Sequence, residues 1–300
     1  ASTYFQLETR LKNIEEAENL FQKGRVRLVI VFPPDLQAAF YRGTGPKIQL
    51  LADATDPNVA TTLINYARAI IMRYVSEQNP VAVSPLVIDT RTHMMYNPML
   101  EGVYMFVPGV MTVILMLVSA MMTSIAITRE KEMGTMEVLL ASPIRPFLII
   151  LGKVSPYILI AMINTAVILL LGTFVFGMPV RGDIWLLIGE CILFVITALS
   201  LGIFISTRAQ TQQVAMMMSM VGLMLPTVIL SGFIFPIESM PEILQWLSHI
   251  IPAKWFIIIL KNIMLKGVGL EFVWKETLAL GAMTLIFVLI SIKNLKIRLE

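Results

Sequence analysis

The sequence predicts a mainly α-helical, polytopic membrane protein that also carries a small α/β domain. Two observations lead to this fold class. Hydrophobic residues make up 57% of the 300 positions and charged residues only 14%, whereas an ordinary soluble domain carries about 25% charged residues. The charges are also uneven, because residues 1–101 hold ten Lys or Arg and ten Asp or Glu, while the apolar remainder holds its charges mostly in short gaps. We therefore expect two domains, 1–101 and 102–300.

Five apolar segments are long enough to cross a membrane as helices. The hydrocarbon core of a bilayer is about 30 Å thick and needs roughly 20 apolar residues in helical form. The predicted spans are 103–127, 156–176, 184–206, 214–235 and 276–292. Pro108 and Pro226 lie inside two of them. Membrane helices tolerate such prolines, because neighbouring groups satisfy the carbonyls that proline leaves free.

The segment before the last span, 236–275, has a different pattern. Its two apolar pieces, 242–251 and 254–265, are each too short to span a bilayer. We expect two short helices that are re-entrant or lie at the membrane surface. The alternative is one further span that is broken at Pro252.

The loops between the spans differ in charge. Eight Lys or Arg lie in the gaps 128–155 and 207–213 and in the C-terminal residues 293–300, and the positive-inside rule places these segments in the cytoplasm. All four tryptophans fall on the other side, where an aromatic belt is expected. Residues 1–101 are then extracytoplasmic. The net charge of +3 is what membrane loops usually hold, and no basic stripe suggests a nucleic acid partner.

Residues 1–101 alternate between strand-like and helix-like segments. Apolar, β-rich runs predict strands within 24–33 and 46–58, and apolar residues at helical spacing predict a helix over 58–77. Residues 8–22 and 34–43 also have helical patterns. The segment has no nucleophile elbow and no supported acid pair, so we expect a lid or a docking platform.

No motif for catalysis, cofactor binding or metal binding stands out. Cys191 lies alone in an apolar run, and His93 and His249 are far apart and have no further ligands near them, although a metal site needs several ligands. The closest match to a phosphate loop, LGKVS at 151–155, lacks the upstream glycine and has valine where Ser or Thr is required. ATP would therefore have to be hydrolysed by another subunit.

Few polar side chains lie inside the spans. Glu190 is the one acidic residue well inside a span, and such residues are costly and often functional. Two interpretations stay open for it: a substrate or proton role, or a carboxylate that reaches outer water. Met217 and Met220 lie in the run MMMSMVGLM, which suggests either an adaptable substrate wall or plain packing. Four further side chains are expected to form interhelical hydrogen bonds: Asn164, Thr165, Thr197 and Ser200.

The most distinctive stretch is TREKEMGTMEVLLASPIRP, residues 128–146, a charged run between two spans. At helical spacing, Glu130, Gly134 and Glu137 fall on one face. Such a helix, over about 129–142, can present carboxylates to a partner such as an external ATPase. The alternative is an interfacial helix that only anchors the loop.

The chain resembles the permease subunits of ABC-2 type transporters, the group with a large extracytoplasmic domain between the first and second spans. The resemblance covers nearly the whole chain, and its motifs occur in the same order. They include VPG (107–109), REKEMGTMEVLLASPI (129–144), TRAQTQQVAM (207–216), LSGFIFPIESMP (230–241) and IPAKWF (251–256).

The resemblance implies a function and partners. The chain would be the membrane subunit of an ATP-driven exporter for an amphiphilic or hydrophobic substrate, in a bacterial inner membrane. It would pair with a second permease, identical or paralogous, and with ATP-binding subunits that hold ATP and Mg²⁺. A periplasmic adaptor is a further candidate partner. The charged loop would be the coupling helix that meets the ATP-binding subunit, with these coupling residues: Arg129, Glu130, Lys131, Glu132, Gly134, Thr135 and Glu137.

The sequence departs from the family pattern in one respect. Family members have a cytoplasmic N-terminus and a first span ahead of the outer domain, and no such span precedes residues 1–101 here. We expect six spans in the complete subunit. A rival hypothesis is a membrane-anchored scaffold or sensor whose outer domain binds a ligand and whose loop signals inward. Co-purification with an ATPase would separate the two hypotheses.

The predicted orientation can be tested by cysteine labelling. In a Cys191→Ser background, a membrane-impermeant thiol reagent added from outside should modify Asp53→Cys and spare Glu132→Cys, because the charge bias places the two positions on opposite sides. The reverse pattern would refute the orientation.

Overall fold

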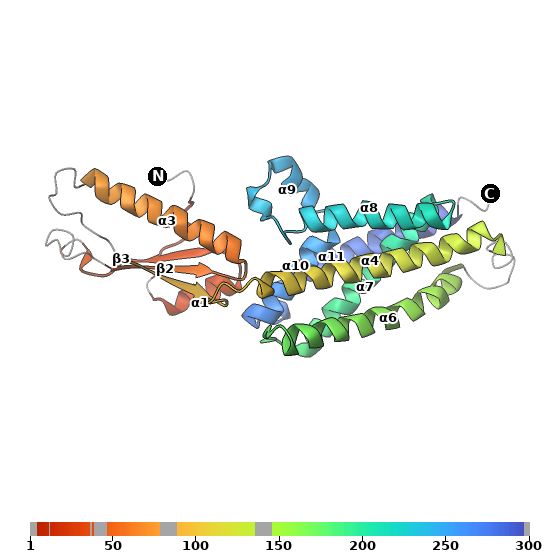
Figure 1. Ribbon diagram of the computed structural model, residues 1–300, viewed down its shortest axis with the longest axis horizontal. Coiled ribbons are helices and arrows are strands. Elements are labelled where there is room, and N and C mark those ends of the chain that lie inside the picture. The colour runs from red at the N-terminus through yellow and green to blue at the C-terminus, as the bar shows by residue number, and fades with distance from the viewer. Residues whose placement is uncertain are drawn as a thin grey trace. The chain divides into compact units, whose positions relative to one another are not determined.

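The chain divides into two compact units, residues 1–105 and residues 106–300 (Figure 1). The structure is a computed structural model. It describes residues 5–11, 13–36, 38, 47–78, 89–135 and 146–296.

The part of the first unit that the structure describes is a three-stranded sheet with a helix on each face (Figure 1). Its elements are α1 (Glu15–Gln22), β1 (Leu28–Val31), β2 (Lys47–Asp53), α3 (Pro57–Gln78) and β3 (Asp89–Met95). The strand order is β1-β2-β3, antiparallel between β1 and β2 and parallel between β2 and β3. Successive side chains of a strand point to opposite faces. Leu50 of β2 therefore belongs to the core under α3, while Leu51 packs with Phe21 of α1.

The small α/β architecture was predicted, but its details differ. The predicted helix 58–77 matches α3, whereas the predicted helix 8–22 is shorter because α1 begins at Glu15. Strand β3 was missed, since DTRTHMM lacks a continuous apolar run and is placed by its pairing with β2. The predicted helix 34–43 lies largely outside the described residues. Asp53 is partly buried and accepts hydrogen bonds from Thr55, so the exposed Ala69 of α3 is a better labelling position for the orientation test.

The second unit confirms the predicted helical membrane architecture. Among its described residues, five helices are long and apolar enough to span a membrane. They are α4 (Val103–Glu132), α6 (Pro146–Phe174), α7 (Ile184–Arg208), α8 (Gln212–Leu230) and α11 (Leu270–Lys296). Helices α4 and α11 extend beyond the predicted apolar segments into the polar residues that flank them, whereas α6 begins earlier, at Pro146, because the apolar run PFLIIL continues the helix ahead of residue 156. Helix α8 ends earlier, where Gly232 has a positive φ of 77°.

Helix α6 contains Pro156 in its interior. Proline lacks the backbone N–H that would bond the carbonyl four residues earlier, here that of Gly152. The Ser155 hydroxyl donates a hydrogen bond to this carbonyl at 3.1 Å. A side chain thus replaces the missing backbone donor, as expected for proline in a membrane helix.

Two short helices precede α11, as predicted. Helix α9 (Glu242–Ser248) and helix α10 (Pro252–Lys261) follow a 3-10 turn η1 (Ile237–Ser239), and a π-helical turn η2 (Asn262–Lys266) extends α10. The two parts are bent by 80° at residues 249–251. This bend fits both sequence interpretations, a re-entrant element and a span broken at Pro252.

Helix α7 is the most buried of the five spans. Its Phe194 ring stacks on Phe256 of α10 with centroids 4.0 Å apart. Its Gly202 faces α4 closely: a Cβ built there would lie 2.4 Å from the carbonyl oxygen of Ala120 and 2.9 Å from the Cβ of Thr123. Small residues allow membrane helices to approach in this way.

The predicted interhelical hydrogen bonds are only partly present. Thr197 of α7 shares one with Thr284 of α11 at 2.6 Å, as predicted. The hydroxyls of Thr165 and Ser200 instead donate to carbonyls of their own helices, an alternative that sequence spacing does not exclude. A further pair, Ser124 of α4 and Ser219 of α8 at 2.8 Å, was not predicted.

We expect Gly202→Val to destabilise the bundle by about 1–3 kcal/mol, because the added side chain would force α4 and α7 apart. The measurement is the melting temperature of the purified, detergent-solubilised permease. Gly189→Val is the matched control, since Gly189 lies in the same helix and a Cβ there meets nothing within 4 Å. Equal melting temperatures for the two variants would contradict the proposed packing.

Candidate functional site

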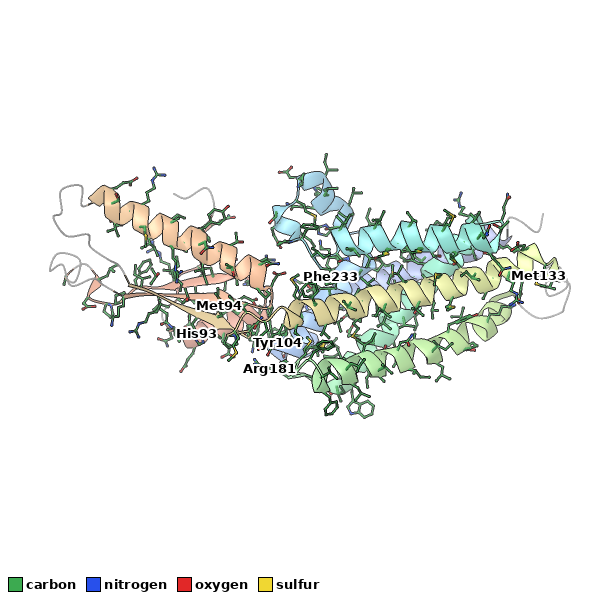
Figure 2. All side chains as sticks on the ribbon, in the orientation of Figure 1. His93, Met94, Tyr104, Met133, Arg181 and Phe233 are labelled. Carbon is green, nitrogen blue, oxygen red and sulfur yellow. The ribbon has the colours of Figure 1, made fainter. Side chains whose placement is uncertain are left out.

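The charged motif begins as the last turn of α4. The helix continues past its apolar part through Glu132, and the amides of Met133 and Gly134 still donate to the carbonyls of Arg129 and Lys131 at 3.0 and 3.2 Å. Gly134 then adopts a left-handed φ of 74°, which is the usual way for glycine to end a helix. Figure 2 shows Met133 at this end of α4, at the opposite end of the bundle from Phe233.

This ending changes the expected geometry of the coupling segment. A single helix over 129–142 was predicted, but residues 129–132 belong to the span helix, and Thr135 is helical again only after the turn at Gly134. Glu130 and Gly134 therefore do not share one continuous helical face. Glu137 lies outside the described residues, so its place on that face stays a prediction.

Lys131 contacts the end of α7. Its Nζ donates a hydrogen bond to the backbone carbonyl oxygen of Ser206, in the last turn of that helix. The last four carbonyls of a helix have no partner within it, and a cation is favourable at the negative end of the helix dipole. Lys131 thus partly caps α7.

Glu132 contacts the start of α8. Its Oε2 accepts hydrogen bonds from the backbone N–H of Gln212 at 3.0 Å and from the Gln212 side-chain amide at 3.1 Å. Gln212 is the first residue of α8, and the Thr211 hydroxyl accepts from the N–H of Val214 at 3.3 Å. The first N–H groups of a helix lack internal partners, and an anion there is favourable. Glu132 and Thr211 together cap α8.

Glu130 contacts the third neighbour, α6. Its carboxylate forms an ion pair with Nζ of Lys153, and the two side chains are 26% and 23% exposed. We call Glu130, Lys131 and Glu132, with their partners Lys153, Ser206 and Gln212, the α4 clamp. Arg129, Met133, Gly134 and Thr135 take no part in the clamp and are exposed, as is Glu132 within it.

The predicted acidic residue inside a span is buried. Glu190 is 3% exposed, and its Oε1 accepts a hydrogen bond from the Thr277 hydroxyl of α11 at 2.6 Å. Within the described part of the chain, its Oε2 has no hydrogen-bond partner, and neither has Oε2 of Glu276. The alternative of a carboxylate that reaches outer water therefore does not match its burial.

The methionine run lies on α8. Met217 and Met220 are 63% and 51% exposed and so point away from the other helices of this chain. Ser219, between them, is buried against α4 through Ser124. The two methionines are thus available to lipid, to a substrate or to another subunit.

Sequence reasoning missed the residues that receive these contacts. Lys153 lies in LGKVS and Gln212 in TRAQTQQVAM, but neither motif pointed to a contact with α4; Thr277 lies in no motif, and Ser206 contributes only its backbone carbonyl. The available signal was Lys131 followed by Glu132 at the end of a span, since a cation suits the C-terminal end of a neighbouring helix and an anion suits an N-terminal end.

The comparison with protein families decides the identity. The model of the ABC-2 family transporter protein family matches residues 1–293. The chain belongs to this family. It is therefore the polytopic membrane component of an ABC transporter, a permease subunit, which favours transport over the scaffold or sensor hypothesis.

Three relatives with curated descriptions are similar in sequence to this ABC-2 permease over most of its length. The probable multidrug ABC transporter permease YbhS of Escherichia coli K12 is 33% identical over 260 residues, which cover 85% of this chain and 68% of that protein. YbhR of the same organism, also described as a probable multidrug ABC transporter permease, is 29% identical over 89% of this chain and 72% of its own length. ABC transporter G family member 20 of Dictyostelium discoideum is 27% identical over 84% of this chain and 35% of its own length. No solved structure matches.

If Glu190 binds the cationic group of a substrate, Glu190→Gln should lower transport of a lipophilic cation by about tenfold or more, because the amide keeps the shape and loses the charge. Transport of a neutral amphiphile of similar size should not change. The measurement is uptake into proteoliposomes, with assembly checked by gel filtration. Thr277→Val is the control that removes the hydrogen-bond donor and keeps the charge. Unchanged transport of the cation in Glu190→Gln would contradict the substrate role.

Proposed function

We propose that this permease is the membrane subunit of an ATP-driven exporter that moves an amphiphilic or hydrophobic substrate out of the cytoplasm or the inner leaflet. ATP and Mg²⁺ would be held by a separate ATP-binding subunit, because no phosphate loop occurs in this sequence. The substrate class is supported by the relatives described as probable multidrug permeases and by the apolar bundle.

The observation that carries the coupling proposal is the exposed tip beyond the α4 clamp. Arg129, Met133 and Thr135 are exposed there, and no described residue lies within 4 Å of a Cβ built on Gly134. A cation and an apolar side chain beside an open glycine form a surface on which a partner can pack. The ATP-binding subunit would dock on this tip and on the segment that follows, including Glu137.

The substrate would pass between two permeases, identical or paralogous. The exposed Met217 and Met220 of α8 support this route, since flexible thioether side chains adapt to different apolar ligands. Glu190 would offer a buried counter-charge. Residues 1–101 would lie outside an inner membrane, where they could meet a periplasmic adaptor.

The docking proposal predicts that Arg129→Glu combined with Met133→Glu weakens association with the ATP-binding subunit by about tenfold or more, because the first reverses a charge at the interface and the second puts a charge where an apolar side chain packed. The measurement is recovery of the ATP-binding subunit with the purified permease. Lys275→Glu, an exposed reversal in the first turns of α11, is the control. Full recovery with the double variant would refute docking on this tip.

A further inference from the structure

We propose that Glu130, Lys131 and Glu132 are positioning residues that transmit the movement of the coupling segment from α4 to three other spans. The inference rests on the proposed function, because it assumes that an ATP-binding subunit acts on the segment after α4. It assigns these three side chains to contacts inside the permease, in contrast to the expectation that they contact the partner.

The order of the charges supports the proposal. Lys131 places a cation at the carbonyl end of α7, and Glu132 places an anion at the amide end of α8. Both signs match the helix dipoles they meet. Residues 209–211 alone join α7 to α8. The contacts of Lys131 and Glu132 therefore hold this short connection against the last turn of α4.

The third contact lies on a different helix. Glu130 pairs with Lys153 of α6, which follows α4 after the charged loop. Three consecutive residues of α4 therefore contact three helices, and each uses a charged group for its contact. Hydrogen bonds that involve charged groups are stronger than neutral ones, so these contacts suit the transfer of a displacement better than apolar packing alone.

Two exposed residues of the same segment, Arg129 and Met133, are not part of the clamp. Arg129 and Met133 flank the three clamp residues in sequence, yet both point to the surface. Docking and transmission thus use different side chains, and the two roles can be tested by different substitutions.

The main test measures whether α8 responds to nucleotide. The permease with Met217→Cys and Cys191→Ser is purified with its ATP-binding subunit in lipid nanodiscs. The rate of thiol labelling at position 217 is compared without nucleotide and with ATP and vanadate.

Adding Lys131→Glu and Glu132→Lys together keeps the net charge and places each charge at the wrong helix end. We expect the nucleotide-dependent difference in labelling to shrink roughly tenfold, while the ATP-binding subunit stays bound. Lys131→Arg, which keeps a cation and donors, should preserve the difference.

A charge exchange distinguishes the clamp from a partner contact. Glu130→Lys and Lys153→Glu should each reduce the nucleotide-dependent difference, and the two together should restore it, because the ion pair forms again with reversed signs. Recovery of purified, monodisperse permease checks that each variant folds.

Three results would overturn the proposal. The first is a full nucleotide-dependent difference in labelling at position 217 in the variant that exchanges Lys131 and Glu132, and the second is no recovery of this difference in the variant that exchanges Glu130 and Lys153. The third is no such difference in the chain with an intact clamp. Failed rescue would assign Glu130 to the partner interface. Failure of the docking proposal would look different, since the Arg129 and Met133 double variant would then retain the ATP-binding subunit whatever the clamp variants do.

Discussion

At the ends of its helices, an apolar bundle has backbone N–H and C=O groups that lack hydrogen-bond partners within the helix, and apolar surroundings supply few other partners. In this permease, one turn of α4 provides partners at two other helix ends. Lys131 gives a donor to the carbonyl of Ser206, and Glu132 gives an acceptor to the amide of Gln212. The connection between α7 and α8 can be short because part of its capping comes from α4. The tip that follows depends on this arrangement, since the clamp side chains contact neighbouring helix ends while Arg129 and Met133 stay at the surface.

Inside the bundle, the helices are held together by close approach and by polar side-chain pairs. Hydrophobic burial gives little reason for one helix to contact another in lipid, so close approach and polar pairs decide which helices pack. Gly202 lets α7 approach α4, and Thr197 joins α7 to Thr284 of α11. Helix α7 thereby becomes the helix around which the others are arranged, and it carries Glu190 in the same buried setting.

The five spans could be predicted because each is a long apolar run, and run length alone identifies a membrane helix. Strand β3 could not, since its seven residues are mostly polar and it is placed by pairing with β2. For the candidate site, the sequence indicated the charged motif at 128–146, but not the contacts of its side chains with α6, α7 and α8. The pairing of Glu130 with Lys153 crosses the whole charged loop, and spacing within one helix carries no information about it. The break at Gly134 was hidden for a similar reason, because a helical wheel assumes that the helix continues.

The four helices joined at the clamp should not be equally stiff. Helix α6 lacks one backbone hydrogen bond at Pro156, and the Ser155 hydroxyl that replaces it at the Gly152 carbonyl is a single rotatable group. Helices bend preferentially at such points. Lys153 lies within this weakened turn, whereas α7 is held by packing along much of its length. A displacement of α4 should therefore be met by flexure of α6 next to its ion pair, while α7 moves as a rigid rod.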